Sequence, residues 1–352
     1  MSFAMTIIQW FREHGRALPW RETRDPYAVW LSEIILQQTR IEQGRPYWER
    51  FMRRWPTVAD LAAASEDEVL REWQGLGYYS RARHLRAAAG QIVGMGAFPS
   101  TIEGIRSLKG VGDYTAAAIG SIAFGLPAAV VDGNVYRVLA RHFGIATPIN
   151  TTEGKREFAL LAQSLLPQET ATTPHSPTLT SEYNQGMMDF GALQCVPQSP
   201  HCPLCPLQDS CAALREGRVS ELPVKQRTVR VRERHLIYIY IRCQGMTAIH
   251  RRPAGDIWQG LYEPLCLEVS GEEADVRSLA QAAGVTIPPA SRLSPLRKTV
   301  RHVLTHRVIY AGFWLWETEE RPPLPDGYHW IKESDIDHYG VPRLIELLLE
   351  TL

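Results

Sequence analysis

Four of the six cysteines are concentrated in one short segment, and this clustering constrains the chain more than any other feature. They follow the pattern C-x6-C-x2-C-x5-C, at Cys195, Cys202, Cys205 and Cys211. A tight group of this kind in a reducing compartment is typical of a metal centre, whereas secreted disulfide frameworks spread their cysteines along the chain. Structural zinc sites usually use two close pairs, and here only Cys202 and Cys205 form one. A cubane iron–sulfur cluster accepts four separately placed thiolates, so the spacing favours a cluster while zinc remains an alternative.

Composition places the chain among ordinary globular proteins. Its 352 residues suffice for two domains with separate cores, and 45% hydrophobic with 22% charged residues excludes disorder. No segment reaches the ~18 apolar residues of a membrane span. The first ten residues lack a signal-peptide pattern, so we expect a cytoplasmic protein. The net charge is zero, although basic residues concentrate in 225–234 and 291–307, where a solvated face is the commoner interpretation and a phosphate-facing groove the alternative.

The periodicity of apolar residues changes about two thirds of the way along the chain. Before that point it predicts helices at Tyr27–Arg40, Glu66–Trp73, Ser80–Val93, Tyr114–Phe124, Gly133–Phe143 and Glu182–Leu193, with an inserted loop at Pro167–Ser181. Beyond it, strands are expected at His235–Arg242, Leu265–Val269 and Val308–Trp316, alternating with helices at Ala274–Ala283 and Val341–Leu349. We therefore predict a multidomain protein, with an all-α domain over residues 1–220, a basic linker over 221–233 and an α/β domain over 234–352.

A glycine turn within the helical part predicts contact with a phosphate backbone. The segment LKGVGDYTAAAI at 108–119 places Gly110 and Gly112 around one small apolar residue, between two helices. Outward-pointing backbone N–H groups at such a turn can bind a phosphate without reading base sequence. Many helix hairpins use glycine for steric reasons alone, but the apolar lead-in and the following helix start resemble the helix-hairpin-helix of DNA-repair proteins.

Two carboxylates are candidates for chemistry, and each also has an ordinary structural interpretation. Asp132 follows an apolar run and precedes a helix, as an N-cap does. Glu33 lies in the apolar helix YAVWLSEIILQQTR, with no Lys or Arg three or four residues away. Such an acid is either exposed or desolvated with a raised pKa, and a raised pKa suits a general acid. From the residues alone, a structural and a catalytic role stay open for each of the two acids.

Taken together, these segments closely resemble the adenine DNA glycosylases of the MutY family, within the endonuclease III-like superfamily. The resemblance covers almost the whole chain, and LPWR, LSEIILQQT and the second domain favour this family over endonuclease III itself. It is carried by WFREHGRALPWR, VWLSEIILQQTR, WQGLGYYSRARHL, LKGVGDYTAAAI, VDGNVYRVLAR, YNQGMMDFGALQC, the cysteine cluster and RHVLTH. It implies an all-α helix-hairpin-helix glycosylase with a [4Fe–4S] loop at 195–211, followed by a Nudix-like α/β domain.

The resemblance also assigns roles to the catalytic candidates. Glu33 matches the general acid that protonates adenine, and Asp132 matches the carboxylate that stabilises the sugar oxocarbenium ion. Tyr114 and Asn134 match residues that support this site. Bifunctional relatives place a lysine where Tyr114 stands, so the resemblance implies a monofunctional glycosylase; Lys109 lies nearby, but on the hairpin side of the turn.

The remaining implied residues bind DNA. An adenine flipped out of the duplex would enter a pocket containing Arg16, Trp20, Arg21 and Gln185. The family's residues beside the lesion match Gln38, Thr39, Leu76, Tyr78, Gly110, Gly112, Thr305 and His306. In the second domain, Leu304 departs from the family's usual Phe-Ser-His loop. That domain lacks the dense acidic motif with which Nudix hydrolases bind magnesium, which argues against nucleotide hydrolysis.

The resemblance thus implies base excision repair of adenine opposite 8-oxoguanine or guanine in double-stranded DNA. The enzyme would act as a monomer at the bacterial nucleoid, and it would not bind a membrane. One alternative is an endonuclease III-like glycosylase and lyase for oxidised pyrimidines, which Tyr114 and the second domain disfavour. Another is a non-catalytic damage-binding protein, which would have no need for both Glu33 and Asp132.

Overall fold

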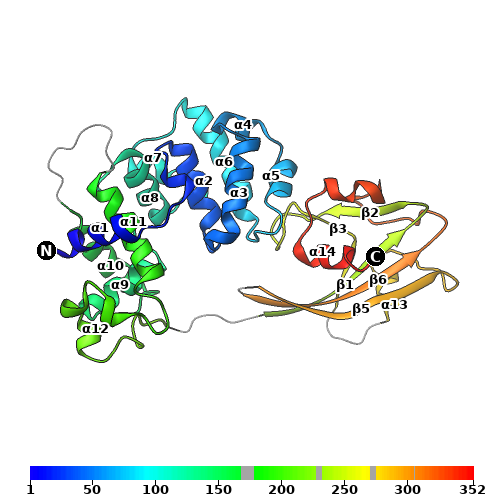
Figure 1. The fold of residues 1–352 in the computed structure, drawn as a ribbon. Coiled ribbons are helices and arrows are strands. Elements are labelled where there is room, and N and C mark those ends of the chain that lie inside the picture. The colour runs from blue at the N-terminus through cyan, green and yellow to red at the C-terminus, as the bar shows by residue number, and fades with distance from the viewer. Residues whose placement is uncertain (168–177, 227–231, 270–274, 305) are drawn as a thin grey trace. The chain divides into compact units, whose positions relative to one another are not determined.

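The structure, a computed structural model, describes residues 1–167, 178–226, 232–269, 275–304 and 306–352 (Figure 1). Contacts between residues divide the chain into two compact units. Unit 1 comprises Met1–Ala63 with Ala87–Arg227, and unit 2 comprises Ala64–Arg86 with Thr228–Leu352. The segment 64–86 thus groups with the C-terminal part, although the sequence assigns it to the helical domain. The predicted boundaries at 220 and 234 stay predictions.

Unit 1 is helical, as the periodicity of its sequence predicts. Its longer helices are α1 (Phe3–His14), α2 (Pro26–Leu36), α3 (Ile41–Arg54), α8 (Asp113–Phe124), α9 (Gly133–Phe143), α10 (Thr152–Ser164) and α11 (Leu179–Leu193), and α6 (Ser80–Met95) lies in both units. Shorter elements are η1 (Pro19–Arg21), α4 (Val58–Ala63), α7 (Ile102–Arg106), η2 (Cys202–Leu204), η3 (Gln208–Ser210) and α12 (Ala212–Arg215).

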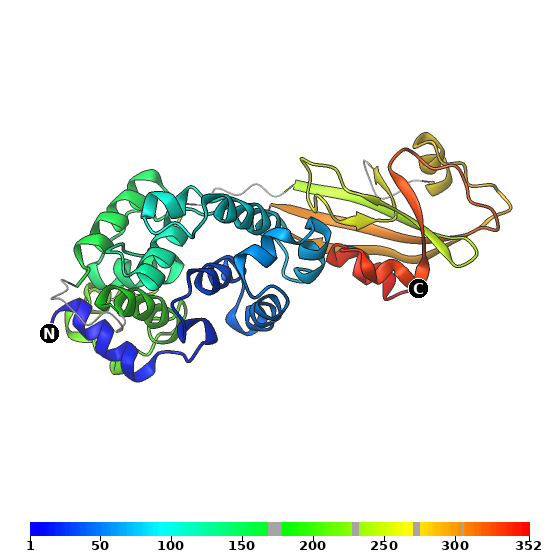
Figure 2. The same cartoon turned by 90° about the horizontal axis from the view of Figure 1, so that it is seen from above.

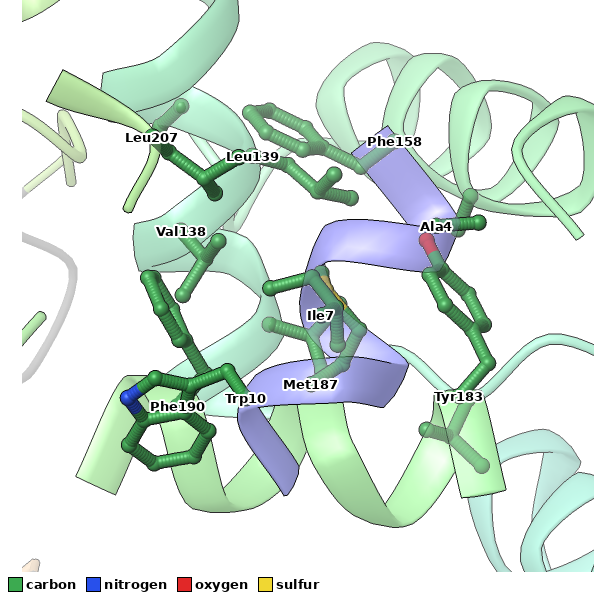
Figure 3. Packing of buried hydrophobic residues seen from close by; sticks show 14 of the residues in the cluster. Ala4, Ile7, Trp10, Val138, Leu139, Phe158, Tyr183, Met187, Phe190 and Leu207 are labelled. Atoms are coloured by element: carbon green, nitrogen blue, oxygen red, sulfur yellow. The ribbon is translucent and has the colours of Figure 1, made fainter. Parts of the chain in front are cut away.

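A large hydrophobic core holds α1, α9 and α11 together. Figure 3 shows Ile7 and Trp10 of α1 packed among side chains of the other two helices. The Trp10 ring meets Phe190 edge-on, with ring centroids 5.0 Å apart, and Val138 and Met187 are almost fully buried. Figure 2 shows α1, in blue, lying beside the green α11. This packing fixes the positions of the N-terminus of α9 and of one face of α11, from which site residues extend.

The helix-hairpin-helix turn lies between α7 and α8, as predicted. Gly110 has a φ of +80°, a conformation that glycine adopts without steric cost. Gly112 is the N-cap of α8 with an ordinary φ of −99°, and an added Cβ there would meet nothing within 4 Å. Backbone conformation therefore requires a glycine at position 110 but not at 112. The Lys109 backbone N–H donates to Gln91 Oε1 at 2.7 Å, which holds the turn on α6.

Unit 2 contains two sheets. The larger has the order β4-β1-β6-β5, in which β1 (Arg232–Arg242) runs parallel to β6 (Arg307–Glu317) and antiparallel to β4 (Leu265–Val269). Its fourth strand, β5 (Arg292–Val303), pairs antiparallel with β6. The smaller sheet has the order β3-β2-β7, from β3 (Tyr262–Glu263), β2 (Met246–Arg251) and β7 (Tyr328–Lys332).

Alternating side chains of β1 face different helices of unit 2. Tyr238 and Tyr240 pack with α14 (Arg343–Leu349), whereas Ile239 and Ile241 pack with α13 (Val276–Ala282). This two-residue period is what a strand between two apolar layers requires. A 3-10 turn, η4 (Glu333–His338), precedes α14.

The 64–86 segment of unit 2 is held by polar contacts to the C-terminal residues of the same unit. Its helix α5 (Glu66–Glu72) begins with a capping box, and Arg251 Nη2 lies 2.8 Å from Glu66 Oε1. Gln74 Nε2 donates to Glu346 Oε1 at 2.6 Å. The loop that carries Leu76 and Tyr78 therefore begins at a residue bonded to α14.

The structure corrects some predicted elements. Helix α2 ends at Leu36 rather than at Arg40, because Gln38 takes a φ of +56°. Helix α11 begins at Leu179, inside the predicted loop 167–181, whose residues 168–177 lie outside the described residues. Strand β5 was not predicted, because its basic residues and Pro295 obscure the alternation; the register shifts beside Pro295. Within the described ranges, no helix is long and apolar enough to cross a membrane.

Candidate active site

One cavity of about 360 Å³ in unit 1 brings together all the predicted catalytic and adenine-pocket residues. Its walls come from η1, α2, α8, α11 and the N-termini of α3 and α9. The predicted residues that line it are Arg16, Trp20, Arg21, Glu33, Thr39, Tyr114, Asp132, Asn134 and Gln185. The volume lies within the range of small-molecule sites, so it is large enough for one nucleobase.

Glu33 extends into this cavity from an otherwise apolar helix. The Tyr114 hydroxyl donates to Glu33 Oε2 at 3.0 Å and also lies 3.3 Å from the sulfur of Met188. Burial raises the pKa of Glu33 to about 7, and the negative charge of Asp132 acts in the same direction. The hydrogen bond from Tyr114 and the charge of Arg21 partly oppose this shift. Near neutral pH the side chain can therefore hold a proton and also release it.

Asp132 is the N-cap of α9, so the ordinary structural interpretation of this residue is correct. Its Oδ1 accepts from the backbone N–H groups of Asn134 and Val135 at 2.9 and 2.7 Å, and its Oδ2 accepts from Asn134 Nδ2 at 3.0 Å. Burial raises the pKa of Asp132, while these three donors and the charge of Arg137 lower it. An N-cap that also lines the cavity directs a carboxylate into it from a fixed helix end.

Arg137 connects this helix end to the cysteine segment. Its Nη2 donates to Asn134 Oδ1 at 2.8 Å and to the Gly191 carbonyl at 2.5 Å, and its Nε donates to the Cys195 carbonyl at 2.7 Å. Helices α9 and α11 approach closely here, because a Cβ on Gly191 would lie 2.6 Å from the Cβ of Asn134. The position of Asn134 thus depends on a buried arginine and on a glycine.

Sequence reasoning missed one buried acid beside the cavity. Asp189 on α11 is fully buried and pairs with both Arg16 and Arg21. A usable signal was present: like Glu33, Asp189 has no Lys or Arg three or four residues away in its helix. The residues paired with it lie 168 and 173 positions earlier in the chain, where helical spacing gives no information about them.

Trp20 and Gln185 complete the predicted pocket. Trp20 is buried and meets Trp48 edge-on, with ring centroids 5.6 Å apart. Gln185 is also buried, and its Nε2 donates to the Ser181 hydroxyl at 3.1 Å. Both side chains are therefore fixed by neighbours before any ligand enters.

The predicted DNA-contacting residues lie outside this cavity, apart from Thr39. Gln38 is exposed with a positive φ, and so is Tyr78, whose φ is +47° and whose exposed fraction is 47%. Leu76 is buried. His306 is exposed after β5, and Thr305 lies outside the described residues.

The four clustered cysteines lie together in unit 1. They line one small cavity of about 30 Å³ with Arg141, whose guanidinium donates to the carbonyls of Val196, Pro197 and Leu222. Among the described residues, no three His, Cys, Asp or Glu side chains converge closely enough to hold a metal ion. Four free thiols around one cavity suit a group that is bound by four separately placed thiolates, as a cubane cluster is.

Comparison with known proteins identifies both parts of the chain. Residues 31–164 match the model of the HhH-GPD superfamily of base excision DNA repair proteins, and residues 237–351 match the NUDIX domain. The adenine DNA glycosylase of Buchnera aphidicola subsp. Schizaphis graminum is 32% identical over 263 residues, which cover 74% of this chain and 73% of that protein.

Two further comparisons extend this result. The adenine DNA glycosylase of Rattus norvegicus is 41% identical over 63% of this chain, and the alignment spans 44% of the length of the rat protein. Among solved structures, a thermostable thymine-DNA glycosylase is 30% identical with a TM-score of 0.54, over 61% of this chain and 95% of that one.

Proposed function

This chain belongs to the adenine DNA glycosylase family, and from this premise we propose that it hydrolyses the bond between adenine and deoxyribose in double-stranded DNA. The adenine would stand opposite 8-oxoguanine or guanine, and its removal would begin base excision repair. The pair formed by Glu33 and Asp132 in one cavity supports this assignment most strongly, because cleavage of a glycosidic bond needs one protonated and one ionised carboxyl group.

The side chains of this cavity can carry out the reaction in two steps. An adenine extruded from the duplex enters the cavity, and Glu33 donates its proton to a ring nitrogen. The electrons of the C–N bond leave with the base, and the ionised Asp132 stabilises the oxocarbenium ion that remains on the sugar. A water molecule then adds to that carbon, and its proton returns to Glu33. The products are free adenine and an abasic site.

We expect a monofunctional reaction, because Tyr114 stands where bifunctional relatives have a lysine. A lyase needs an amine that attacks the sugar carbon, and among the described residues around the cavity there is no lysine. The enzyme should therefore leave the strand intact until alkali cleaves the abasic site, and borohydride should trap little protein on the DNA.

The other residues are assigned as follows. Gly110 and the adjoining backbone N–H groups would bind a phosphate, and Gln38, Tyr78 and His306 would contact the duplex near the lesion. A [4Fe–4S] cluster held by the four clustered cysteines would stabilise the segment between α11 and α12, and iron and acid-labile sulfide should be present in equal amounts. With DNA as its substrate, the protein would work at the nucleoid of a bacterial cytoplasm, as a monomer.

The test is a single-turnover assay on duplexes that each contain one A:8-oxoguanine, A:G, A:T or C:8-oxoguanine pair. Alkali-dependent cleavage of the adenine strand, fastest opposite 8-oxoguanine and abolished by Glu33→Gln, is the expected result. Glu42→Gln is the matched control, because Glu42 lines the same cavity but is exposed on α3. Binding without adenine release would contradict the proposal, and so would direct strand cleavage at an oxidised pyrimidine.

A further inference from the structure

A buried carboxylate holds two arginines at the wall of the cavity. Asp189 accepts from the backbone N–H and the Nε of Arg16 at 2.9 and 3.0 Å, and from the Nη2 of the same side chain. It also accepts from Arg21 Nη1 and Nη2 at 2.7 and 2.8 Å. Its side chain has no exposed surface, whereas Arg16 and Arg21 remain 29% and 14% exposed and line the cavity.

This arrangement differs from an ordinary structural ion pair. On the same helix, Glu182 pairs with Arg12 in a bidentate contact at the surface, where Arg12 is 55% exposed. Asp189 instead serves two guanidiniums at once, and burial alone would raise its pKa. The hydrogen bonds from Arg21 and Arg16 outweigh burial, and the net effect is to hold the pKa of Asp189 below its usual value.

We propose that Asp189 is a positioning residue for adenine excision: it fixes Arg16 and Arg21 at the cavity wall and offsets one of their two positive charges, so that Glu33 can keep its proton near neutral pH. This inference rests on the proposed function. Asp189 does not itself line the cavity, so it acts through the two arginines.

The charges around Glu33 explain why the offset matters. Three groups act directly on Glu33, namely Tyr114 on α8, Asp132 before α9 and Arg21 in η1. The positive charge of Arg21 favours the ionised form of Glu33. Exposed Arg40 and Glu42 also line the cavity, with opposite charges.

Arg16, Arg21 and Asp189 together carry one positive charge. Without the Asp189 carboxylate, the two arginines carry two positive charges. Their side chains are partly shielded from solvent, so their charge interactions are strong. The added charge would favour the ionised form of Glu33.

The test is the pH dependence of single-turnover adenine excision by Asp189→Asn, which keeps the shape of the side chain and removes its charge. Excision requires protonated Glu33, so the rate falls as the pH rises through the pKa of Glu33. The variant should shift this alkaline limb down by about one pH unit, which lowers the rate about tenfold on the alkaline side and far less on the acid side. An unchanged profile would contradict the inference, and so would an equal loss at every pH, which a purely structural role predicts.

Two further variants make the result specific. Glu182→Gln removes a bidentate carboxylate from the same helix and should leave the profile unchanged. Asp189→Asn combined with Arg16→Gln restores the net charge and should return the alkaline limb toward its original position, even if the overall rate stays low. A limb that stays displaced in the double variant would show that charge is not the cause.

A measurement without substrate separates this inference from the proposed function. Carbon-13 NMR of the Glu33 carboxyl gives its titration directly, and Asp189→Asn should lower the midpoint. If the wild type released no adenine but this midpoint fell, the proposed function would fail and the effect of Asp189 on Glu33 would stand. If the wild type were active and the midpoint did not move, the inference alone would fail.

Discussion

Glu33 and Asp132 show how two similar carboxyl groups acquire different properties within one cavity. Glu33 accepts a hydrogen bond from Tyr114, and burial raises its pKa to about 7. Asp132 is partly buried and its pKa is also raised, but two backbone N–H groups and the side chain of Asn134 donate to it and favour its ionised form. The pKa of both groups is raised by burial, and the larger number of donors opposes that rise more strongly at Asp132.

The raised pKa of Glu33 has a cost in stability that can be measured. The unfolded side chain titrates near 4.5 and the folded one near 7. Below the unfolded pKa both states are protonated and there is no cost. As the pH rises through the folded pKa, the cost of ionising a buried group reaches its full value. Glu33→Gln should therefore raise the free energy of unfolding by on the order of 2 kcal/mol above neutral pH, and by little in acid.

Urea unfolding at several pH values checks this expectation. Glu42→Gln is again the control, since an exposed glutamate has no such cost and should give no pH-dependent gain. Two outcomes would contradict the expectation: a gain in the free energy of unfolding that persists in acid, or no gain above neutral pH. Either would show that ionising Glu33 does not destabilise the folded protein.

Helix α9 is the element on which the site most depends. Its N-terminus carries Asp132 and Asn134, and one turn later Arg137 contacts both Asn134 and the Cys195 carbonyl. The next turn carries Arg141, which holds three carbonyls of the cysteine segment and its surroundings. One helix therefore fixes both the carboxylate that we propose for the reaction and the segment that would hold the cluster.

Arg137→Gln should weaken excision without abolishing the fold. The substitution removes four charge-assisted hydrogen bonds, of which the shorter side chain recovers a fraction, and we expect about a tenfold slower single-turnover rate. Arg156→Gln, at an exposed position of α10, is the control and should leave the rate unchanged. The iron content, measured in parallel, shows which contact of Arg137 matters. A slower rate with full iron content would assign the loss to Asn134 and Asp132, and not to the cysteine segment.

At the scale of the whole molecule, the residues proposed to contact the lesion include one, His306, that lies in a different unit from the cavity. The cavity lies in unit 1, and His306 belongs to unit 2, between β5 and β6. Strands β5 and β6 form a hairpin, and the residues on either side of its turn are held in place. The Leu304 N–H donates to the Arg307 carbonyl at 2.8 Å, and Arg307 pairs with Asp256 at 2.7 Å. An exposed histidine next to the fixed Arg307 is suited to a specific contact.

His306→Ala should therefore reduce the preference for A:8-oxoguanine over A:G by up to about tenfold, the value of one hydrogen bond, while excision from A:G changes little. His338→Ala, which removes another exposed histidine of unit 2, is the matched control. An equal loss on both duplexes would assign His306 to general DNA binding instead of to the lesion.

Local patterns in the sequence determined much of this protein. Helical periodicity predicted α9 with its bounds, and the apolar run before Asp132 predicted its N-cap, because both depend on residues within a few positions of one another. The cysteine spacing predicted that four thiolates surround one metal centre, and the four cysteines do line one cavity. Strand β5 was missed because its apolar alternation is interrupted by Pro295 and basic residues.

Only the tertiary structure decided what surrounds the two acids. Tyr114 reaches Glu33 across 81 positions of the chain, and Arg21 reaches Asp189 across 168. These contacts arise where helices cross, through packing between distant segments, and no local periodicity encodes them. The sequence by itself therefore supplied the acids and the helices that carry them. The protonation of Glu33 and the pairing of Asp189 follow from burial and from partners that the fold alone brings near.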